Sequence, residues 1–241
     1  MRQGNSQAGK AFTAICVFLI IIGGWAGYRY YAMQKLASAP LPDGGGRQGR
    51  CVLWFVGSST INYWTSLAQD MAPWTTHNRG IAGAVFPQII RHFEADEKVQ
   101  PPEAIMLYAG ENDIAKGSNA DREIANLKAF LAVKDRKFPH TPLFFISTKP
   151  SPTRWASFAE QTRYNSAARA LITARKDAAY VNIVPMLLTR GRPGNFYVAD
   201  GVHLNPEGYR RVAGVIRGAL ESDLPVERVR QCLSEPLAGR D

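Results

Sequence analysis

The segment from Val52 to Val56 is a short run of apolar, mostly β-favouring residues, and it ends abruptly in Gly57-Ser58-Ser59. A run this short, bounded by a turn of small residues, predicts a buried strand. The residues that follow, as far as Met71, have helix-like spacing. In an open α/β sheet, ligands bind at the carboxyl ends of the strands. The hydroxyl of Ser59 is therefore predicted to lie at that edge of a sheet.

The same alternation of strand and helix continues along the chain. Further strands are expected over His77–Arg79, Ala104–Tyr108, Leu143–Ser147 and Tyr180–Ile183. Helices are expected over Ile61–Met71, Phe86–Ala95, Ala120–Val133, Phe158–Lys176 and Pro206–Leu220. Strands separated by helices of these lengths predict an α/β fold with a doubly wound, parallel five-stranded sheet and helices on both faces.

The N-terminal segment differs in character from the rest. Ala11 to Gly27 is almost purely apolar, and tyrosines follow it. A run of this length is close to the shortest helix that spans a membrane, and aromatic residues at its end suit an interface. Residues 1–35 are therefore expected to form one uncleaved transmembrane anchor. A signal peptide cleaved near Ala37-Ser38-Ala39 and a buried core helix are the alternatives.

Proline, glycine and polar residues dominate positions 36–50, which predicts a flexible linker to a folded domain over 51–235. The 241-residue chain is 46% hydrophobic, a composition that argues against wholesale disorder. Its formal charge is +9, but the basic residues are scattered rather than gathered on one helix. Nucleic acid is therefore not an expected partner.

The cysteines, Cys16, Cys51 and Cys232, lack the spacing of metal ligands, so no metal site is expected. The last predicted helix should carry the chain from the active edge to the opposite edge, where Cys51 starts the first strand. Cys232, some ten residues further on, can reach it. We therefore expect a disulfide and an oxidising compartment outside the cytoplasm, with two free thiols in a cytosolic domain as the alternative.

Three more loops hold residues suited to catalysis. Gly83 ends a glycine-containing turn whose backbone N–H groups could face a ligand. Asn112, just past a predicted strand, could donate its amide to a developing oxyanion. Asp200 and His203 are three residues apart, a spacing that lets the carboxylate orient the imidazole as a base for a serine. Taken singly, each motif has a structural alternative as a helix cap, a turn or exposed turn residues.

Together with the first loop, these motifs resemble the conserved blocks of the SGNH (GDSL-type) hydrolases over about residues 51–221. The matching motifs occur in the order of that family: Gly57-Ser58-Ser59, Gly83, Gly110-Glu111-Asn112-Asp113 and Asp200-Gly201-Val202-His203. The resemblance implies a flavodoxin-like sheet and an ester hydrolase that needs no metal or organic cofactor.

The resemblance also implies a catalytic triad. Ser59 would be the nucleophile, His203 the base that removes its proton, and Asp200 the residue that orients the histidine. The family's usual Gly-Asp-Ser reads Gly-Ser-Ser here, so Ser58 is the alternative nucleophile.

An oxyanion hole is implied in the same way. The backbone N–H groups of Ser59 and Gly83 and the side-chain amide of Asn112 would form it. Gly83 is preferred to Gly80 because the family's glycine ends the Asn-x-Gly-x-x-Gly run.

The loop after the fourth predicted strand carries Lys149, Arg154 and Trp155, and it should rise on the active edge. These side chains could bind an anionic group or a sugar ring of the substrate. The alternative is a solvated basic loop with Trp155 packed on the following helix.

The resulting hypothesis is a serine esterase tethered to a membrane, with its domain on the periplasmic or extracellular side. Its partner would be an acyl ester, short-chain or acetyl, on an envelope glycan or a lipid. O-acyl transfer to a sugar hydroxyl and a lysophospholipase-like activity are alternatives that use the same triad. A catalytically idle envelope-binding module is the alternative outside the enzymes.

Overall fold

The computed structural model describes residues 39, 41–42, 51–96 and 100–234. The chain divides into two compact units, Met1–Ala39 and Pro40–Asp241, and nearly all described residues belong to the second. The predicted membrane anchor over 1–35 lies outside the described residues. Within the described ranges, no helix is both long and apolar enough to cross a bilayer.

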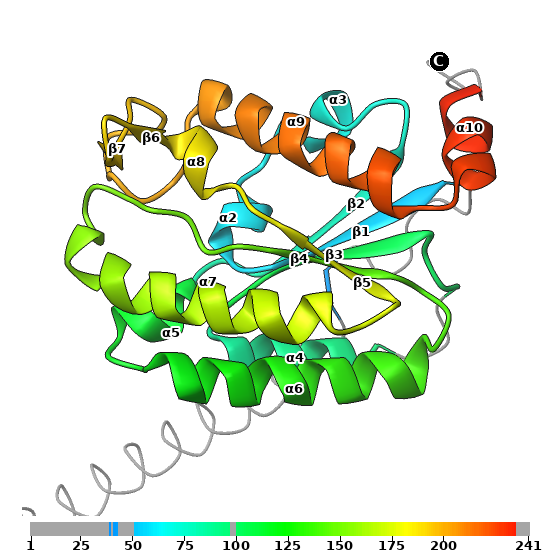
Figure 1. The fold of residues 1–241 in the computed structure, drawn as a ribbon, viewed down its shortest axis with the longest axis horizontal. Coiled ribbons are helices and arrows are strands. Elements are labelled where there is room, and N and C mark those ends of the chain that lie inside the picture. Colours follow the sequence, from blue (N-terminus) through cyan, green and yellow to red (C-terminus); the bar gives the residue numbers. More distant parts are fainter. Residues whose placement is uncertain (1–38, 40, 43–50, 97–99, 235–241) are drawn as a thin grey trace, which may run out of the picture. The chain divides into compact units, whose positions relative to one another are not determined.

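Five parallel strands form the central sheet, in the order β2-β1-β3-β4-β5 (Figure 1). Their bounds are β1 Val52–Gly57, β2 Thr75–Gly80, β3 Ala104–Tyr108, β4 Leu143–Ile146 and β5 Ala178–Val181. Every residue of β1, β3 and β4 is buried, because helices cover both faces of the sheet. The strand order confirms the predicted parallel, doubly wound sheet, and the order reverses between β1 and β3.

Helices pack on the two faces of this sheet (Figure 1). One face carries α2 (Ser59–Asn62), α3 (Leu67–Asp70), α8 (Val184–Leu187), α9 (Pro206–Asp223) and α10 (Val226–Ser234). The other carries α4 (Phe86–Glu94), α5 (Glu111–Ala115), α6 (Ala120–Lys137) and α7 (Phe158–Thr173). Alternate residues of β1 supply the two layers: Leu53 and Phe55 face one, and Trp54 and Val56 face the other.

Helix α9 is fixed against the turn that follows β1. The ring of Trp64 stacks on that of Tyr209, with centroids 5.0 Å apart. The Tyr209 hydroxyl also donates to the backbone oxygen of Thr60 at 3.0 Å. Asn205 caps the helix by accepting the N–H of Gly208 at 2.9 Å. The first turn of α9 and the first turn of α2 are therefore held together.

The segment predicted as one helix over Ile61–Met71 forms two short helices, α2 and α3, instead. Between them Trp64 turns into the core, and its Nε1 donates to Asp70 Oδ2 at 2.7 Å. The hydroxyl of Ser66 donates to the same oxygen at 2.6 Å. These side-chain bonds stabilise a turn where helix-like spacing alone predicted continuity.

Short elements after β4 and β5 complete the described domain. They are the 3-10 helix η1 (Trp155–Ser157) and the two-stranded hairpin of β6 (Leu188–Thr189) and β7 (Arg192–Pro193). These elements were not predicted from the sequence, and neither were α5, α8 and α10.

Part of the predicted linker is attached to the domain. Leu41 is buried in the layer beneath α4 and α6, and the backbone oxygen of Pro42 accepts a hydrogen bond from Arg79 Nε at 3.2 Å. Most other residues of 36–50 lie outside the described ranges.

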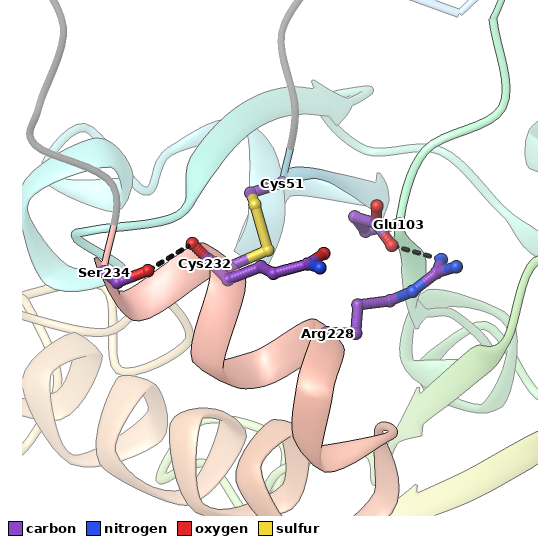
Figure 2. Close-up of a disulfide and its surroundings, with 6 residues drawn as sticks. Cys51, Glu103, Arg228, Cys232 and Ser234 are labelled. Atoms are coloured by element: carbon purple, nitrogen blue, oxygen red, sulfur yellow. Dashed lines mark hydrogen bonds and ion pairs between the residues drawn. A yellow bond between two sulfur atoms is a disulfide. The ribbon is translucent and has the colours of Figure 1, made fainter.

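A disulfide joins Cys51, directly before β1, to Cys232 on α10 (Figure 2). The two Cα atoms are 5.5 Å apart, and the residues are 181 positions apart in the sequence. Arg228 of α10 forms an ion pair with Glu103 beside β3 (Figure 2). Helix α10 is therefore attached by a covalent bond and by an ion pair to the edge where the strands begin.

We expect the Cys51→Ser/Cys232→Ser variant to unfold at lower urea concentration than the oxidised protein. Closing so long a loop restricts the unfolded chain, and such bonds typically contribute about 2–4 kcal/mol. Urea unfolding of the oxidised protein, the reduced protein and the variant measures this difference. Equal stability of all three would show that the bond contributes nothing.

Candidate active site

Ser59, His203 and Asp200 form one hydrogen-bonded chain at the carboxyl edge of the sheet. His203 Nε2 lies 2.8 Å from Ser59 Oγ, and His203 Nδ1 lies 2.6 Å from Asp200 Oδ2. A proton on Nδ1, shared with the carboxylate, leaves the Nε2 lone pair free to accept the serine proton. The structure therefore brings Ser59 together with Asp200 and His203, which lie more than 140 positions further along the chain.

The turn between Asp200 and His203 is fixed by several hydrogen bonds. Asp200 Oδ1 accepts the backbone N–H groups of Val202 at 2.8 Å and His203 at 2.9 Å. Gly201 has a φ of 64°, and a Cβ there would lie 2.5 Å from Thr153 Oγ1, so this position requires glycine. Thr153 donates its N–H to the Gly201 oxygen at 3.1 Å and its hydroxyl to the Asp200 oxygen at 2.7 Å.

The same bonds keep Asp200 ionised. Its partial desolvation favours the protonated carboxyl, but the hydrogen bonds from the His203 ring and from the two backbone N–H groups outweigh this. They lower the pKa of Asp200 to about 2. At neutral pH the imidazole therefore always faces a carboxylate.

Tyr63 is a neighbour of His203 that the sequence analysis missed. It directly follows α2, and its ring lies edge-on to the imidazole with centroids 4.8 Å apart. The side chain is 48% exposed. Its position four residues after Ser59, one helical turn away, is the signal that could have suggested it.

The two segments predicted to hold oxyanion donors are bonded to each other. Asn112, in the first turn of α5, donates its side-chain amide to the backbone oxygen of Ala84 at 2.9 Å. Both carboxylate oxygens of Asp113 lie 3.0 Å from the backbone nitrogen of Phe86, which donates to them. Gly83 directly precedes Ala84 and lies in the left-handed region, with a φ of 71°. The backbone of Gly83 and the side chain of Asn112 therefore belong to one rigid corner.

A buried ion pair adjoins this corner, because Glu111 directly precedes Asn112. Lys149 and Glu111 are 0% and 2% exposed, and Lys149 Nζ lies 2.6 Å from Glu111 Oε2. Lys149 also donates to the Oγ1 of Thr60, the residue after Ser59, at 3.2 Å. The Tyr108 hydroxyl donates to the same Glu111 carboxylate, and Arg154 Nη1 lies 3.0 Å from its other oxygen.

Burial and charge have opposite effects on the pKa values of Lys149 and Glu111, and they act together on that of Tyr108. Burial lowers the pKa of Lys149, although Glu111 opposes the shift. Burial by itself would raise the pKa of Glu111, but Lys149 and Arg154 outweigh it and the pKa lies below its ordinary value. Burial and the charge of Glu111 raise the pKa of the Tyr108 hydroxyl. Tyr108 therefore stays protonated and donates its hydrogen bond to a carboxylate.

The three residues predicted to meet a substrate have different positions. Lys149 is buried and ion-paired, which corrects the expectation that it contacts substrate, because the loop turns it inward to neutralise Glu111. Trp155 stacks on Phe158 at the start of α7, with centroids 4.6 Å apart, as the packing alternative predicts. Arg154 is 24% exposed and bonds to the buried cluster.

No group of three or more His, Cys, Asp or Glu side chains in the described ranges is arranged to hold a metal ion.

The ion pairs of Glu111 with Lys149 and Arg154 were not predicted from the sequence. A glutamate inside the third motif, together with a lysine just past the next strand, was the available signal.

The fold and the arrangement of these side chains place the protein among the ester hydrolases. Residues 44–211, more than half of the chain, match the GDSL-like lipase/acylhydrolase family. The protein belongs to this family, and the resemblance seen in the four motifs is confirmed.

Solved structures share the fold across most of their length. A protein from Streptococcus pneumonia has a TM-score of 0.67 at 21% identity, covering 85% of this chain and 99% of its own. A GDSL-like lipase from Bacteroides thetaiotaomicron has a TM-score of 0.59 at 25% identity, covering 83% and 99%. A family 3 carbohydrate esterase from Clostridium thermocellum has a TM-score of 0.60 at 16% identity, covering 77% and 100%. No curated protein matches the sequence.

We expect Lys149→Met to destabilise the domain by about 3 kcal/mol, because Glu111 would stay buried with one cation fewer. Lys116→Met, at an exposed position, is the matched control and should stay within about 0.5 kcal/mol of the parent. Urea unfolding measures both changes. Similar stabilities for the two variants would mean that the buried pair does not hold the loops together.

Proposed function

We propose that the protein is a serine hydrolase that cleaves acyl esters, with Ser59 as nucleophile, His203 as general base and Asp200 as its orienting carboxylate. The observation that carries the proposal is the continuous chain from Ser59 Oγ through the imidazole to Asp200, with distances of 2.8 and 2.6 Å. This arrangement activates a serine that would otherwise be a weak nucleophile.

The reaction has two halves. Ser59 Oγ attacks the acyl carbonyl carbon while its proton moves to His203 Nε2. The tetrahedral oxyanion accepts hydrogen bonds from the backbone N–H groups of Ser59 and Gly83 and from the Asn112 amide. As the oxyanion collapses, Nε2 gives its proton to the departing alcohol and an acyl-serine remains.

Water completes the cycle. It gives a proton to His203 Nε2 as its oxygen attacks the acyl-serine carbonyl, and the second tetrahedral intermediate breaks the bond to Ser59 Oγ. That oxygen takes the proton back from Nε2, and the carboxylic acid leaves. Asp200 remains ionised throughout and stabilises the imidazolium that forms in each half.

The proposed substrate is a short acyl or acetyl ester on a glycan of the cell envelope. A carbohydrate esterase from Clostridium thermocellum shares the fold. The exposed ring of Tyr63 beside His203 offers a flat apolar face to a sugar ring.

We expect Ser59→Ala to abolish hydrolysis of p-nitrophenyl acetate, since the bond-forming oxygen is lost. Ser58→Ala is the matched control and should retain activity, because Ser58 makes no hydrogen bond to the imidazole among the contacts in the structure. Initial rates with the acetate, butyrate and octanoate esters measure both variants and the preferred acyl length.

Loss of activity in Ser58→Ala but not in Ser59→Ala would show that Ser58, not Ser59, is the nucleophile. Preference for the octanoate ester would contradict the short-acyl proposal and favour a lysophospholipase-like enzyme. Release of acyl groups only when a sugar acceptor is added would favour acyl transfer.

We also propose that residues 1–35 anchor the enzyme in a membrane, with the domain in an oxidising space outside the cytoplasm. The apolar run from Ala11 to Gly27 and the Cys51–Cys232 bond support this arrangement. In a bacterial host, we expect the full chain in the membrane fraction and a chain starting at residue 40 in the soluble fraction. Equal partitioning of the two would contradict the anchor.

A further inference from the structure

The side-chain amide of Asn112 is held in one of its two possible orientations. Its Oδ1 accepts a hydrogen bond from Arg154 Nη1 at 2.9 Å, and its Nδ2 donates to the Ala84 oxygen at 2.9 Å. Turning the amide over would set its oxygen against the carbonyl of Ala84 and its NH₂ against a guanidinium. A donor on one side and an acceptor on the other therefore select the same orientation.

This orientation determines what the amide offers to a substrate. Nδ2 carries two hydrogens, and Ala84 accepts one of them, so one N–H remains for an oxyanion. Asn112 is 6% exposed, which means that little water competes for that N–H. In the reversed orientation the amide oxygen would meet the developing negative charge and repel it.

We propose that Arg154 is a positioning residue of the oxyanion hole: it acts through Asn112, whose amide it locks with the N–H toward the reacting carbonyl. This inference rests on the proposed function, because it needs Asn112 to be an oxyanion donor. Neither the family match nor the sequence motifs assign this task to Arg154.

The guanidinium of Arg154 is itself held from behind. Glu111 Oε1 lies 3.0 Å from Arg154 Nη1, and Glu111 is fixed by Lys149 and by the Tyr108 hydroxyl. The cations of Lys149 and Arg154 and the carboxylate of Glu111 together leave one net positive charge beside Asn112. A charge-assisted hydrogen bond from Arg154 is stronger than one from a neutral donor, so the preference for one orientation is correspondingly larger.

The loop that carries Arg154 also reaches the other half of the site. Thr153 binds the backbone oxygens of Asp200 and Gly201, and the Tyr197 hydroxyl donates to the Pro150 oxygen. Arg154 is therefore placed relative to the histidine as well as to the asparagine. The bonds of Thr153 fix the backbone beside Arg154, and Glu111 and Asn112 fix its guanidinium. The side chain therefore loses little further conformational entropy when the substrate binds.

A direct contact between Arg154 and an anionic group of the substrate is the rival explanation, since the side chain is 24% exposed. The two roles make opposite predictions when Asn112 is removed. A positioning residue has nothing left to position, whereas a substrate contact loses its energy whether or not Asn112 is present.

The test is a double-mutant cycle of the full chain with Arg154→Met, Asn112→Ala and both together, assayed on p-nitrophenyl acetate. We expect Arg154→Met to lower kcat about ten- to a hundredfold with little change in KM. Asn112→Ala should lower kcat about a hundred- to a thousandfold. Adding Arg154→Met to Asn112→Ala should change kcat less than about twofold. Losses that multiply in the double variant would overturn the proposal. A kcat for Arg154→Met equal to that of the parent would also overturn it and would favour the substrate contact, because p-nitrophenyl acetate carries no anionic group for Arg154 to bind.

Arg192→Met is the matched control, because Arg192 lies over the Trp155 ring at 5.2 Å on the β6–β7 hairpin and, among the described residues, forms no hydrogen bond to Asn112. Its kcat should equal that of the parent. Should Arg154→Met fail to fold, the same cycle with Arg154→Gln, which keeps an N–H donor, gives the answer: losses that multiply again overturn the proposal. Activity that survives Ser59→Ala would instead refute the proposed function, so the two failures are distinguishable.

Discussion

The pairing of Lys149 with Glu111 is the interaction on which the arrangement of the site depends. Two charges taken out of water are costly unless each finds its partner at good geometry, so the segments that carry them have little freedom to separate. Glu111 begins α5 after β3, and Lys149 follows β4, while the lysine also binds Thr60 at the start of α2. One buried pair thus links three loops at the same edge of the sheet.

The loop after β4 extends this linkage to the histidine. Beyond Lys149, Arg154 binds Asn112, and Thr153 binds the backbone around Asp200 and Gly201. The Ser59 side and the His203 side of the site are therefore joined by one short segment as well as by the contact between α9 and α2. Loops at an active edge are commonly the mobile parts of a fold, and here they share buried polar bonds that restrict them.

Much of the fold and site was predictable because the relevant patterns are local. Strands covered on both faces read as continuous apolar runs, and the Asp200–His203 spacing fits within a single turn. The position of Lys149 was not predictable, because a lysine in a loop is ordinarily solvated and its partner lies 38 residues away. The break between α2 and α3 also depends on side-chain bonds to Asp70 that periodicity does not reveal.

The bond between Cys51 and Cys232 also has a mechanical consequence. A pulling force applied between the two ends of the chain would pass from Cys51 to Cys232 through the sulfur atoms and bypass the whole polypeptide between them. Apart from the contacts of Leu41 and Pro42, the five strands and the loops that hold Ser59 and His203 lie inside that closed loop and off the direct covalent path of the force. An enzyme held at one end while its other end is dragged would keep its reacting groups aligned.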